Sequence, residues 1–328
     1  MRAIVYREYG APDEVLEFGD VDIPVFKEDE VLVRVHAAGL NPYDWLLMRG
    51  LPYVARVVAG PRKPKRTRIL GGDMAGRVEA VGGSVTRFQP GDEVYGEVGF
   101  GGCADYVRFS GTMLGRKPSN LSFEQAAAVP MAGVTALQGV RDKGKVQPGQ
   151  KVLVNGASGG LGTFAVQLAM ASGAEVTGVC SPKNVDMVRS IGADHVIDYT
   201  EQDFTERQER YDLVLDTVGN HPISECRRVL APSGTYGAFG AGGGKWFGPM
   251  VQQIKAVAMS PFVSQRMVPV NDRPNEHLGL LTELIEAGKV TPVVDKTYEL
   301  SETPEAVHYL ETGHARGKVV VTVAAAHA

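Results

Sequence analysis

The stretch KVLVNGASGGLG (151–162) decides the fold of this chain. Its apolar run ends at a turn that carries Gly156, Gly159 and Gly162, and a helical segment, TFAVQLAMAS (163–172), follows. Glycines at such a turn permit a tight corner, close packing of helix on strand, and approach of a phosphate to backbone N–H groups. A tight corner alone would also explain them. Strand, turn, helix and second strand within about 30 residues is the order of a dinucleotide-binding unit, so we expect a bound dinucleotide.

The chain around this turn changes its pattern twice. Residues 1–120 alternate short β-branched runs with turn signals, which predicts a mostly antiparallel β domain. Residues 121–271 alternate apolar strands with helical segments, which predicts a parallel sheet covered on both faces. Residues 272–328 predict helix, strand, helix and strand, and we expect them to return to the first domain.

Two helical segments carry specific signals. Ser122 followed by Gln125 is typical of a capping box at a helix start. Segment 246–262 places apolar side chains on one helical face: Phe247, Met250, Val251, Ile254, Val257 and Ala258. It could wall a substrate pocket, form a subunit contact or rest on a membrane surface. We favour the first two, because its polar face lacks a basic belt.

Composition excludes several function classes. The 328 residues carry a net charge of −4, which argues against a nucleic-acid partner. The basic loop PRKPKRTR (61–68) could bind nucleic acid or anionic lipid, but a solvated loop is the favoured interpretation. The three scattered cysteines, the charged N-terminus and the lack of an apolar run of about 18 residues predict a cytoplasmic protein with no membrane insertion.

The residues after the second strand of the unit bear on which dinucleotide binds. A site for NAD ends this strand with Asp or Glu, which hydrogen-bonds the ribose 2′-hydroxyl. Here EVTGVC (175–180) is followed by Ser181, Lys183 and Asn184, with no acid. A hydroxyl, an amide and an ammonium accept a 2′-phosphate that a carboxylate would repel, so NADPH is favoured. Lys183 could equally be an ordinary exposed lysine.

Six motifs spread along nearly the whole chain carry a family resemblance: AAGLNPYD (37–44), GGDMAGRVEAVG (71–82), FQPGDEVYG (88–96), AAAVPMAGVTA (126–136), NGASGGLG (155–162) and IGADHVIDY (191–199). With them the sequence resembles the medium-chain dehydrogenase/reductase superfamily, in its zinc-independent quinone oxidoreductase branch. The resemblance implies an α/β chain with a GroES-like β-barrel catalytic domain at 1–120, a Rossmann domain with a doubly wound parallel sheet at 121–271, and a return to the catalytic domain at 272–328. It also implies a homodimer.

The family's zinc ligands are missing here. Zinc-dependent relatives have a Cys where this chain has Asn41, a His-Glu pair at Gly72 and Asp73, and a third ligand near 131–134; Cys103 stands alone. A zinc site needs three or four Cys, His or carboxylate ligands, so we expect no metal. Without a Lewis acid, the accessible chemistry is hydride transfer to a small hydrophobic quinone or α,β-unsaturated carbonyl. The alternatives are a non-catalytic cofactor-binding interaction protein and a reductase of another small carbonyl compound.

The resemblance also assigns site residues. Asn41 and Tyr53 are its catalytic candidates; Asn41 could also be a turn former, and Tyr53 an aromatic pocket wall. Asp44 could orient a water or cap a helix, and capping is favoured. The expected cofactor contacts are Asn41, Thr135, Ser158, Gly159, Gly160, Leu161, Ser181, Asn184, Tyr199, Val218, Phe239, Gly240, Arg316 and Lys318.

Overall fold

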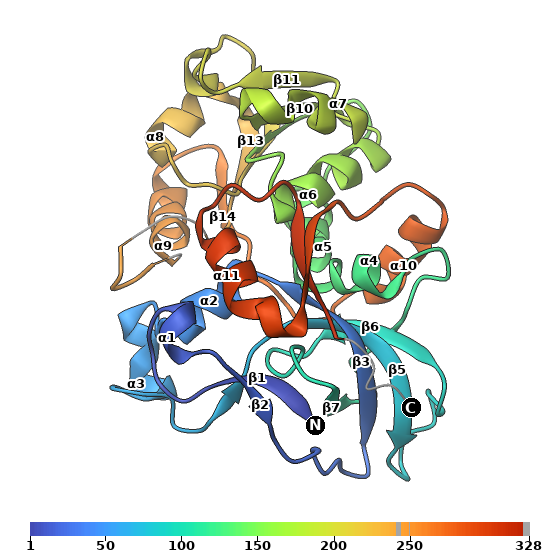
Figure 1. Ribbon diagram of the computed structural model, residues 1–328. Helices are drawn as coiled ribbons and strands as arrows, with labels where there is room; N and C mark the ends of the chain where they lie inside the picture. Colours follow the sequence, from blue (N-terminus) through green and yellow to red (C-terminus); the bar gives the residue numbers. More distant parts are fainter. Residues whose placement is uncertain (241–243, 249, 324–328) are drawn as a thin grey trace. The chain divides into compact units, whose positions relative to one another are not determined.

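The computed structural model describes residues 1–240, 244–248 and 250–323, which form two compact units (Figure 1). Of the described residues, the first unit holds 1–134, 274–288 and 292–323, and the second holds 289–291 and those between 135 and 273. These divisions differ from the expected boundaries at 120 and 271. The boundary expected at 120 lies later because helix α4 (Phe123–Ala127) packs on strands of the first unit. The boundary expected at 271 lies later because Asp272 accepts a hydrogen bond from Thr135 of the second unit.

The first unit is built from two antiparallel-rich sheets. The smaller has the strand order β2-β1-β4, and the larger has the order β15-β16-β3-β5-β6-β8, with β7 also paired to β3. The strands are β1 (Arg2–Tyr6), β2 (Glu17–Asp20), β3 (Glu30–Leu40), β4 (Arg68–Ile69), β5 (Asp73–Val81), β6 (Glu93–Glu97), β7 (Tyr106–Ser110), β8 (Gly115–Arg116), β15 (Val294–Glu299) and β16 (Lys318–Thr322). The predicted return of the C-terminal segment is therefore present, because β16 pairs with β3.

Helices complete this unit and its core. They are α1 (Pro12–Val15), α2 (Pro42–Met48), α3 (Arg56–Ala59), α4, α10 (Leu278–Glu286) and α11 (Thr303–Glu311), with short turns η1 (Tyr53–Ala55) and η7 (Leu300–Glu302). The core joins Ile4, Val33, Met74, Val94 and Val321, all fully buried. Ser122 caps α4: its Oγ accepts the Gln125 N–H, and the Gln125 side chain accepts the Ser122 N–H, as predicted.

The second unit is a six-stranded parallel sheet with the order β11-β10-β9-β12-β13-β14. Its strands are β9 (Lys151–Asn155), β10 (Glu175–Cys180), β11 (His195–Asp198), β12 (Tyr211–Asp216), β13 (Leu230–Ala238) and β14 (Arg266–Pro269). Helix α6 (Gly160–Ala171) packs on β9 and β10, and α7 (Val185–Ser190) packs on β10 and β11 (Figure 1). In chain order this is 3-2-1-4-5-6, so the order reverses between β9 and β12, where such sheets bind ligands.

The remaining elements of the second unit are α8 (Ile223–Cys226), α9 (Met250–Met259), the π-helical η2 (Gln138–Lys143), and short turns η3 (Pro182–Asn184), η4 (Phe204–Glu206), η5 (Arg227–Val229) and η6 (Ser260–Phe262). Helix α5 (Pro130–Leu137) contains the boundary between the units.

Helix α9 does not bury the apolar face that the sequence suggests for 246–262. It buries Gln252 and Ala256 and leaves Ile254 and Val257 exposed. Gln252 is held because its Nε2 donates to the Gly219 carbonyl over 3.1 Å. Pro249 lies outside the described residues.

Candidate active site

The glycine turn of the second unit contains two kinds of glycine. Gly156 has a φ of +84°, which favours glycine, and a side chain on Gly162 would overlap the Gly156 carbonyl. The fold itself therefore requires these two. Gly159 has a φ of −80°, and a Cβ there would meet only the Gly156 carbonyl oxygen, at 3.5 Å. Neither the backbone nor packing within the chain requires Gly159, which is the pattern expected where a ligand approaches the backbone.

Helix α6 begins directly after Gly159 and runs for 12 residues. Its N-cap is this glycine, which has no side chain to cap the first N–H groups. The first N–H groups of a helix have no partner inside the helix, and the helix dipole makes that end favourable for an anion. Ser158, Gly160 and Leu161 lie around this end and are half-buried, so the turn fits a pyrophosphate.

A polar cluster connects the turn to the end of β10. The Asn184 Nδ2 donates to Ser158 Oγ over 3.0 Å and to Ser181 Oγ over 3.1 Å. Asn184 is only 5% exposed, and its Oδ1 has no hydrogen-bond partner in the part of the chain that the structure describes. The structure thus brings together three of the predicted residues. Tyr199 lies after β11 with an exposed side chain.

A second network, which sequence analysis missed, lies where the sheet order reverses. Asn155 ends β9 and Asp216 ends β12, and the Asn155 Nδ2 donates to Asp216 over 2.8 Å. The Tyr236 hydroxyl donates to the other Asp216 oxygen over 2.6 Å, and burial raises the pKa of Tyr236 well above its usual value. Asp216 also accepts the Val218 and Gly219 N–H groups. This buried carboxylate therefore fixes the loop that carries Val218.

Three further predicted cofactor residues of this unit have other surroundings. The Phe239 ring is buried inside the unit, where a Cβ added at Gly139 would overlap it. Gly240 is exposed. The expected position of Phe239 and Gly240 beside the nicotinamide half of the cofactor stays a prediction. The Thr135 hydroxyl donates to Asp272 over 3.2 Å.

Three strands of the first unit bring Asn41, Asp73 and Lys318 together. In the antiparallel pairing of β16 with β3, Val319 lies opposite Leu40, which places Lys318 beside Asn41. In the pairing of β3 with β5, Gly39 lies opposite Asp73. Residues separated by up to 277 positions in the chain thus meet at the end of β3.

These side chains form a buried hydrogen-bonded cluster. The Asn41 Nδ2 donates to Asp73 Oδ2 over 2.9 Å, and the Lys318 Nζ donates to Asn41 Oδ1. Lys318 Nζ lies 3.6 Å from Asp73 Oδ2, and Asp73 Oδ1 accepts the Met131 N–H over 3.1 Å. Asp73 is 0% exposed and Lys318 3% exposed. The Asn41 amide is therefore held in one orientation by a cation on its oxygen and a carboxylate on its nitrogen.

Asp44 completes the cluster as a cap of helix α2, which is the role that the sequence favours. Its carboxylate accepts the Asn41 N–H over 2.7 Å. Burial raises the pKa of Asp44 to about 7, the nearby Asp73 carboxylate raises it too, and the Asn41 and Gly72 N–H groups oppose the rise. Burial also lowers the pKa of Lys318, against the attraction of Asp73 and Asp44.

Asp44 should therefore make stability depend on pH. In the unfolded chain this carboxyl ionises near its usual pKa, whereas in the folded chain it keeps its proton up to about pH 7. Its contribution to stability is present at low pH and is lost as pH rises toward and through 7. Relative to Asp44→Asn, which cannot ionise, the wild-type free energy of unfolding should fall by up to about 1.4 kcal/mol per pH unit in this window. Urea unfolding between pH 4.5 and 8 measures this fall in the free energy of unfolding.

Asp13→Asn, at an exposed carboxyl, is the control. The account would be contradicted if the free energy of unfolding of wild type minus that of Asp44→Asn stayed constant or increased with pH.

The other predicted residues of this unit lie in different contacts. Tyr53 is half-buried in turn η1, with the Arg56 guanidinium 4.7 Å from its ring centre. The Arg316 side chain is exposed, and the Arg316 backbone N–H donates to the Asp295 carboxylate over 2.9 Å. In the basic loop 61–68, Pro64 is buried, and the Arg68 guanidinium lies 4.2 Å from the Phe100 ring centre.

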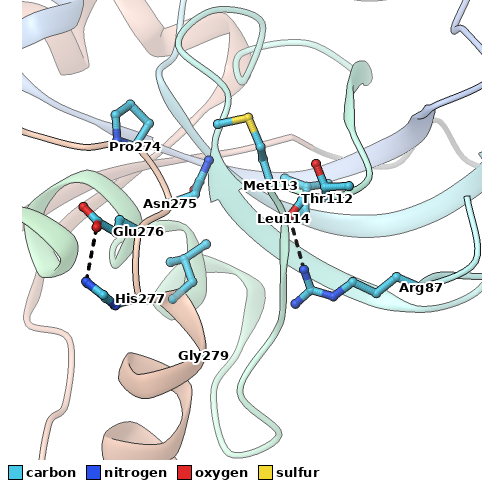
Figure 2. Close-up of a pocket in the computed structure, with 10 residues that line it drawn as sticks. Arg87, Thr112, Met113, Leu114, Pro274, Asn275, Glu276, His277 and Gly279 are labelled. Atoms are coloured by element: carbon cyan, nitrogen blue, oxygen red, sulfur yellow. Dashed lines mark hydrogen bonds and ion pairs between the residues drawn. The ribbon is translucent and has the colours of Figure 1, made fainter.

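A separate cavity of about 260 Å³ in the first unit involves none of these groups. Figure 2 shows it between the segment before β8 and the start of α10, with Arg87 pointing at Thr112 and Glu276 paired with His277. Asn275 anchors its wall to β6, because its side chain exchanges two 2.7 Å hydrogen bonds with the Glu97 backbone. This cavity is not part of the candidate site.

The cluster around Asn41 does not fit the zinc that the family resemblance raises. Its amide and its carboxylate are already bonded to an ammonium, and an amide is not a usual zinc ligand. Among residues 1–240, 244–248 and 250–323, no three His, Cys, Asp or Glu side chains gather to hold a metal ion. No helix in the described part of the chain is long and apolar enough to cross a membrane.

Comparison with known proteins gives matches along nearly the whole chain. Residues 27–171 match the family described as alcohol dehydrogenase GroES-like domain, and residues 191–321 match the family described as zinc-binding dehydrogenase. A mitochondrial NAD(P)H oxidoreductase, RTN4IP1 of Danio rerio, is 34% identical over 98% of this chain and 91% of its own length. A chloroplastic NADPH-dependent alkenal/one oxidoreductase of Arabidopsis thaliana is 34% identical over 98% of this chain and 79% of its own length. The solved quinone oxidoreductase of Coxiella burnetii is 31% identical, covers 99% of both chains and has a TM-score of 0.87.

These matches correct one expectation. The sequence predicts a cytoplasmic protein, yet the names of similar relatives place them in mitochondria or chloroplasts. The prediction of a cytoplasmic location is wrong on this comparison. It rested on the cysteine count and the N-terminal residues, and neither feature identifies the cellular compartment of the chain's relatives.

Proposed function

Because the chain belongs to the medium-chain dehydrogenase/reductase superfamily, in its zinc-independent quinone oxidoreductase-like branch, we propose that it reduces quinones or α,β-unsaturated carbonyl compounds with NADPH. The observation that carries the proposal is Gly159, a glycine that the fold does not require, at the start of a long helix beside the point where the sheet order reverses. The names of the relatives support the acceptor class, since they include an alkenal/one oxidoreductase and a quinone oxidoreductase.

The second unit would hold the cofactor. Ser158, Gly160 and Leu161 would present a hydroxyl and backbone N–H groups to the pyrophosphate, and the bare Gly159 lets it come close, since the Gly159 N–H itself donates to the Gly156 carbonyl over 3.0 Å. Ser181 and Asn184 directly follow β10, where no Asp or Glu stands among residues 181–184, and Lys183 beside them is exposed to solvent. An ammonium and hydroxyl groups attract a 2′-phosphate that Asp or Glu would repel, and this supports NADPH over NADH.

The residues that the family resemblance assigns to the reaction, Asn41 and Tyr53, belong to the first unit. When bound, the reduced nicotinamide supplies a hydride to the electron-poor carbon of the acceptor. Asn41, locked by Asp73 and Lys318, provides a polar contact of fixed direction. Tyr53 or a water then gives the proton that the developing oxyanion needs. Contacts of the cofactor with Thr135, Val218, the backbone at Phe239 and Gly240, and Arg316 belong to the same proposal.

Incubation of the purified chain with NADPH and a panel of 2-alkenals, enones and quinones tests this function by loss of nicotinamide absorbance. We expect turnover with at least one small apolar acceptor, faster with NADPH than with NADH, and unaffected by a chelator. NADPH binding without oxidation by any acceptor would favour a non-catalytic interaction protein and reject the proposal. Size-exclusion chromatography with light scattering tests the implied homodimer.

A further inference from the structure

The Asn184 side-chain amide connects the glycine turn to the residues that follow β10, the two parts of the proposed phosphate site. Ser158 belongs to the glycine turn, Ser181 follows β10, and the Asn184 Nδ2 hydrogen-bonds both hydroxyl oxygens, over 3.0 and 3.1 Å. An amide nitrogen has two hydrogens, so both are used here. Asn184 is fixed further because its backbone N–H donates to the Ser181 carbonyl over 2.9 Å.

This arrangement sets the direction in which the serines donate. A hydroxyl oxygen that accepts a hydrogen bond from Asn184 keeps its own hydrogen for another acceptor. Ser158 and Ser181 can therefore both donate away from Asn184. If the amide were reversed, its Oδ1 would take both hydroxyl hydrogens and leave the serines able only to accept. Phosphate oxygens accept hydrogen bonds, so only the observed orientation suits a phosphate.

The chain itself favours the observed orientation. In it the Asn184 Oδ1 is buried without a partner among the described residues. Reversal would bury the NH₂ group there instead, with two unsatisfied hydrogens. Unpaired buried N–H groups are rarer than under-satisfied carbonyl oxygens, because the carbonyl loses less when it lacks a partner. The unpaired Oδ1 also leaves an acceptor that a hydroxyl of the bound ligand can satisfy.

We propose that Asn184 is the positioning residue that makes this site selective for a nucleotide with a 2′-phosphate. It directs the hydroxyl hydrogens of Ser158 and Ser181 toward phosphate oxygens and offers its own Oδ1 to a ribose hydroxyl. The inference rests on the proposed function, because it assumes that a pyridine dinucleotide binds at this turn.

Two variants separate donor direction from simple packing. Asn184→Asp keeps the shape but accepts from both serines, which reverses their hydrogens. Asn184→Leu keeps the volume and leaves the hydroxyl hydrogens of both serines without a preferred direction.

Loss of charge-assisted hydrogen bonds should weaken NADPH binding to Asn184→Asp by roughly 10- to 100-fold. NADH should lose less, and Asn184→Leu should lie between wild type and Asn184→Asp for NADPH. Calorimetric dissociation constants for NADPH and NADH measure these effects without turnover.

The added charge of Asn184→Asp needs its own control. In a Ser181→Ala background, repulsion of the 2′-phosphate persists but one redirected hydroxyl is absent. Asn184→Asp should therefore cost NADPH binding less in that background than in wild type. An equal loss in both backgrounds, or an Asn184→Leu variant with unchanged NADPH and NADH constants, would overturn the proposal. Wild type that binds neither nucleotide would instead reject the proposed function itself. If Asn184→Asp fails to fold, Asn184→Leu still decides the matter.

Discussion

Replacing Lys318 by methionine is expected to lower the free energy of unfolding by about 3–5 kcal/mol, because it leaves the Asp73 carboxylate buried without its cation. Asp73 is 0% exposed, and Lys318 Nζ lies 3.6 Å from its Oδ2. Methionine keeps most of the side-chain length, so the change reports on charge more than on volume. Urea denaturation followed by circular dichroism measures the loss.

Two further variants show whether the pair is responsible. Lys296→Met, on the neighbouring strand β15, removes an exposed ammonium that lies 3.8 Å from the Tyr309 ring centre, and it should cost less than about 1 kcal/mol. The double variant Lys318→Met with Asp73→Asn removes both charges and should recover much of the loss, even if the single variant does not fold. A Lys318→Met protein as stable as Lys296→Met would mean that the buried pair does not hold the cluster.

Gly159→Ala should separate cofactor binding from folding. A φ of −80° suits alanine, and its Cβ would meet only one carbonyl oxygen, at 3.5 Å. The stabilisation from a less flexible unfolded chain offsets the poorer N-cap, so the free energy of unfolding should change by less than about 1 kcal/mol. The same methyl group stands where a pyrophosphate would approach the backbone, and NADPH should bind at least about tenfold more weakly. Calorimetry and thermal unfolding on the same sample measure both effects.

Gly162→Ala is the matched control. Its Cβ would overlap the Gly156 carbonyl, so this variant should lose stability whether or not a nucleotide is present. If Gly159→Ala destabilised the chain as much as Gly162→Ala, the argument that the fold leaves Gly159 to a ligand would fail. Unchanged NADPH affinity in Gly159→Ala would also contradict the argument that a ligand approaches the backbone at Gly159.

Local patterns predicted local structure well. The Ser122 and Gln125 pair caps α4, and the turn with Gly156 and Gly162 joins β9 to α6. Each of these features is decided within one turn of chain, by hydrogen bonds or by steric limits that depend on neighbouring residues. The alternation of apolar strands with helical segments after residue 150 also predicted the parallel sheet, because parallel neighbours need a crossover connection, usually a helix.

Features that depend on strand register could not be predicted this way. Lys318 meets Asn41 only because β16 pairs with β3 in one register, and Asp216 meets Asn155 and Tyr236 only because three strands lie side by side. Lys318 lies in a buried ion pair with Asp73, and its expected contact with the cofactor stays a prediction. Helix α9 exposes Ile254 and Val257 of its apolar face, and the pocket or subunit contact favoured for this face stays a prediction. Its apolar spacing does not reveal that Gln252 is buried because the Gln252 amide donates to the Gly219 carbonyl.

The fate of the nicotinamide hydrogen tests the central claim most directly. The chelator-treated chain is incubated with an α,β-unsaturated ketone and NADPH that carries deuterium at C4, on one face of the ring and then on the other. The account predicts a saturated product with deuterium at the former β-carbon from one of the two labelled faces. Product without deuterium at that carbon from either face, or reduction that disappears when metal is removed, would contradict it.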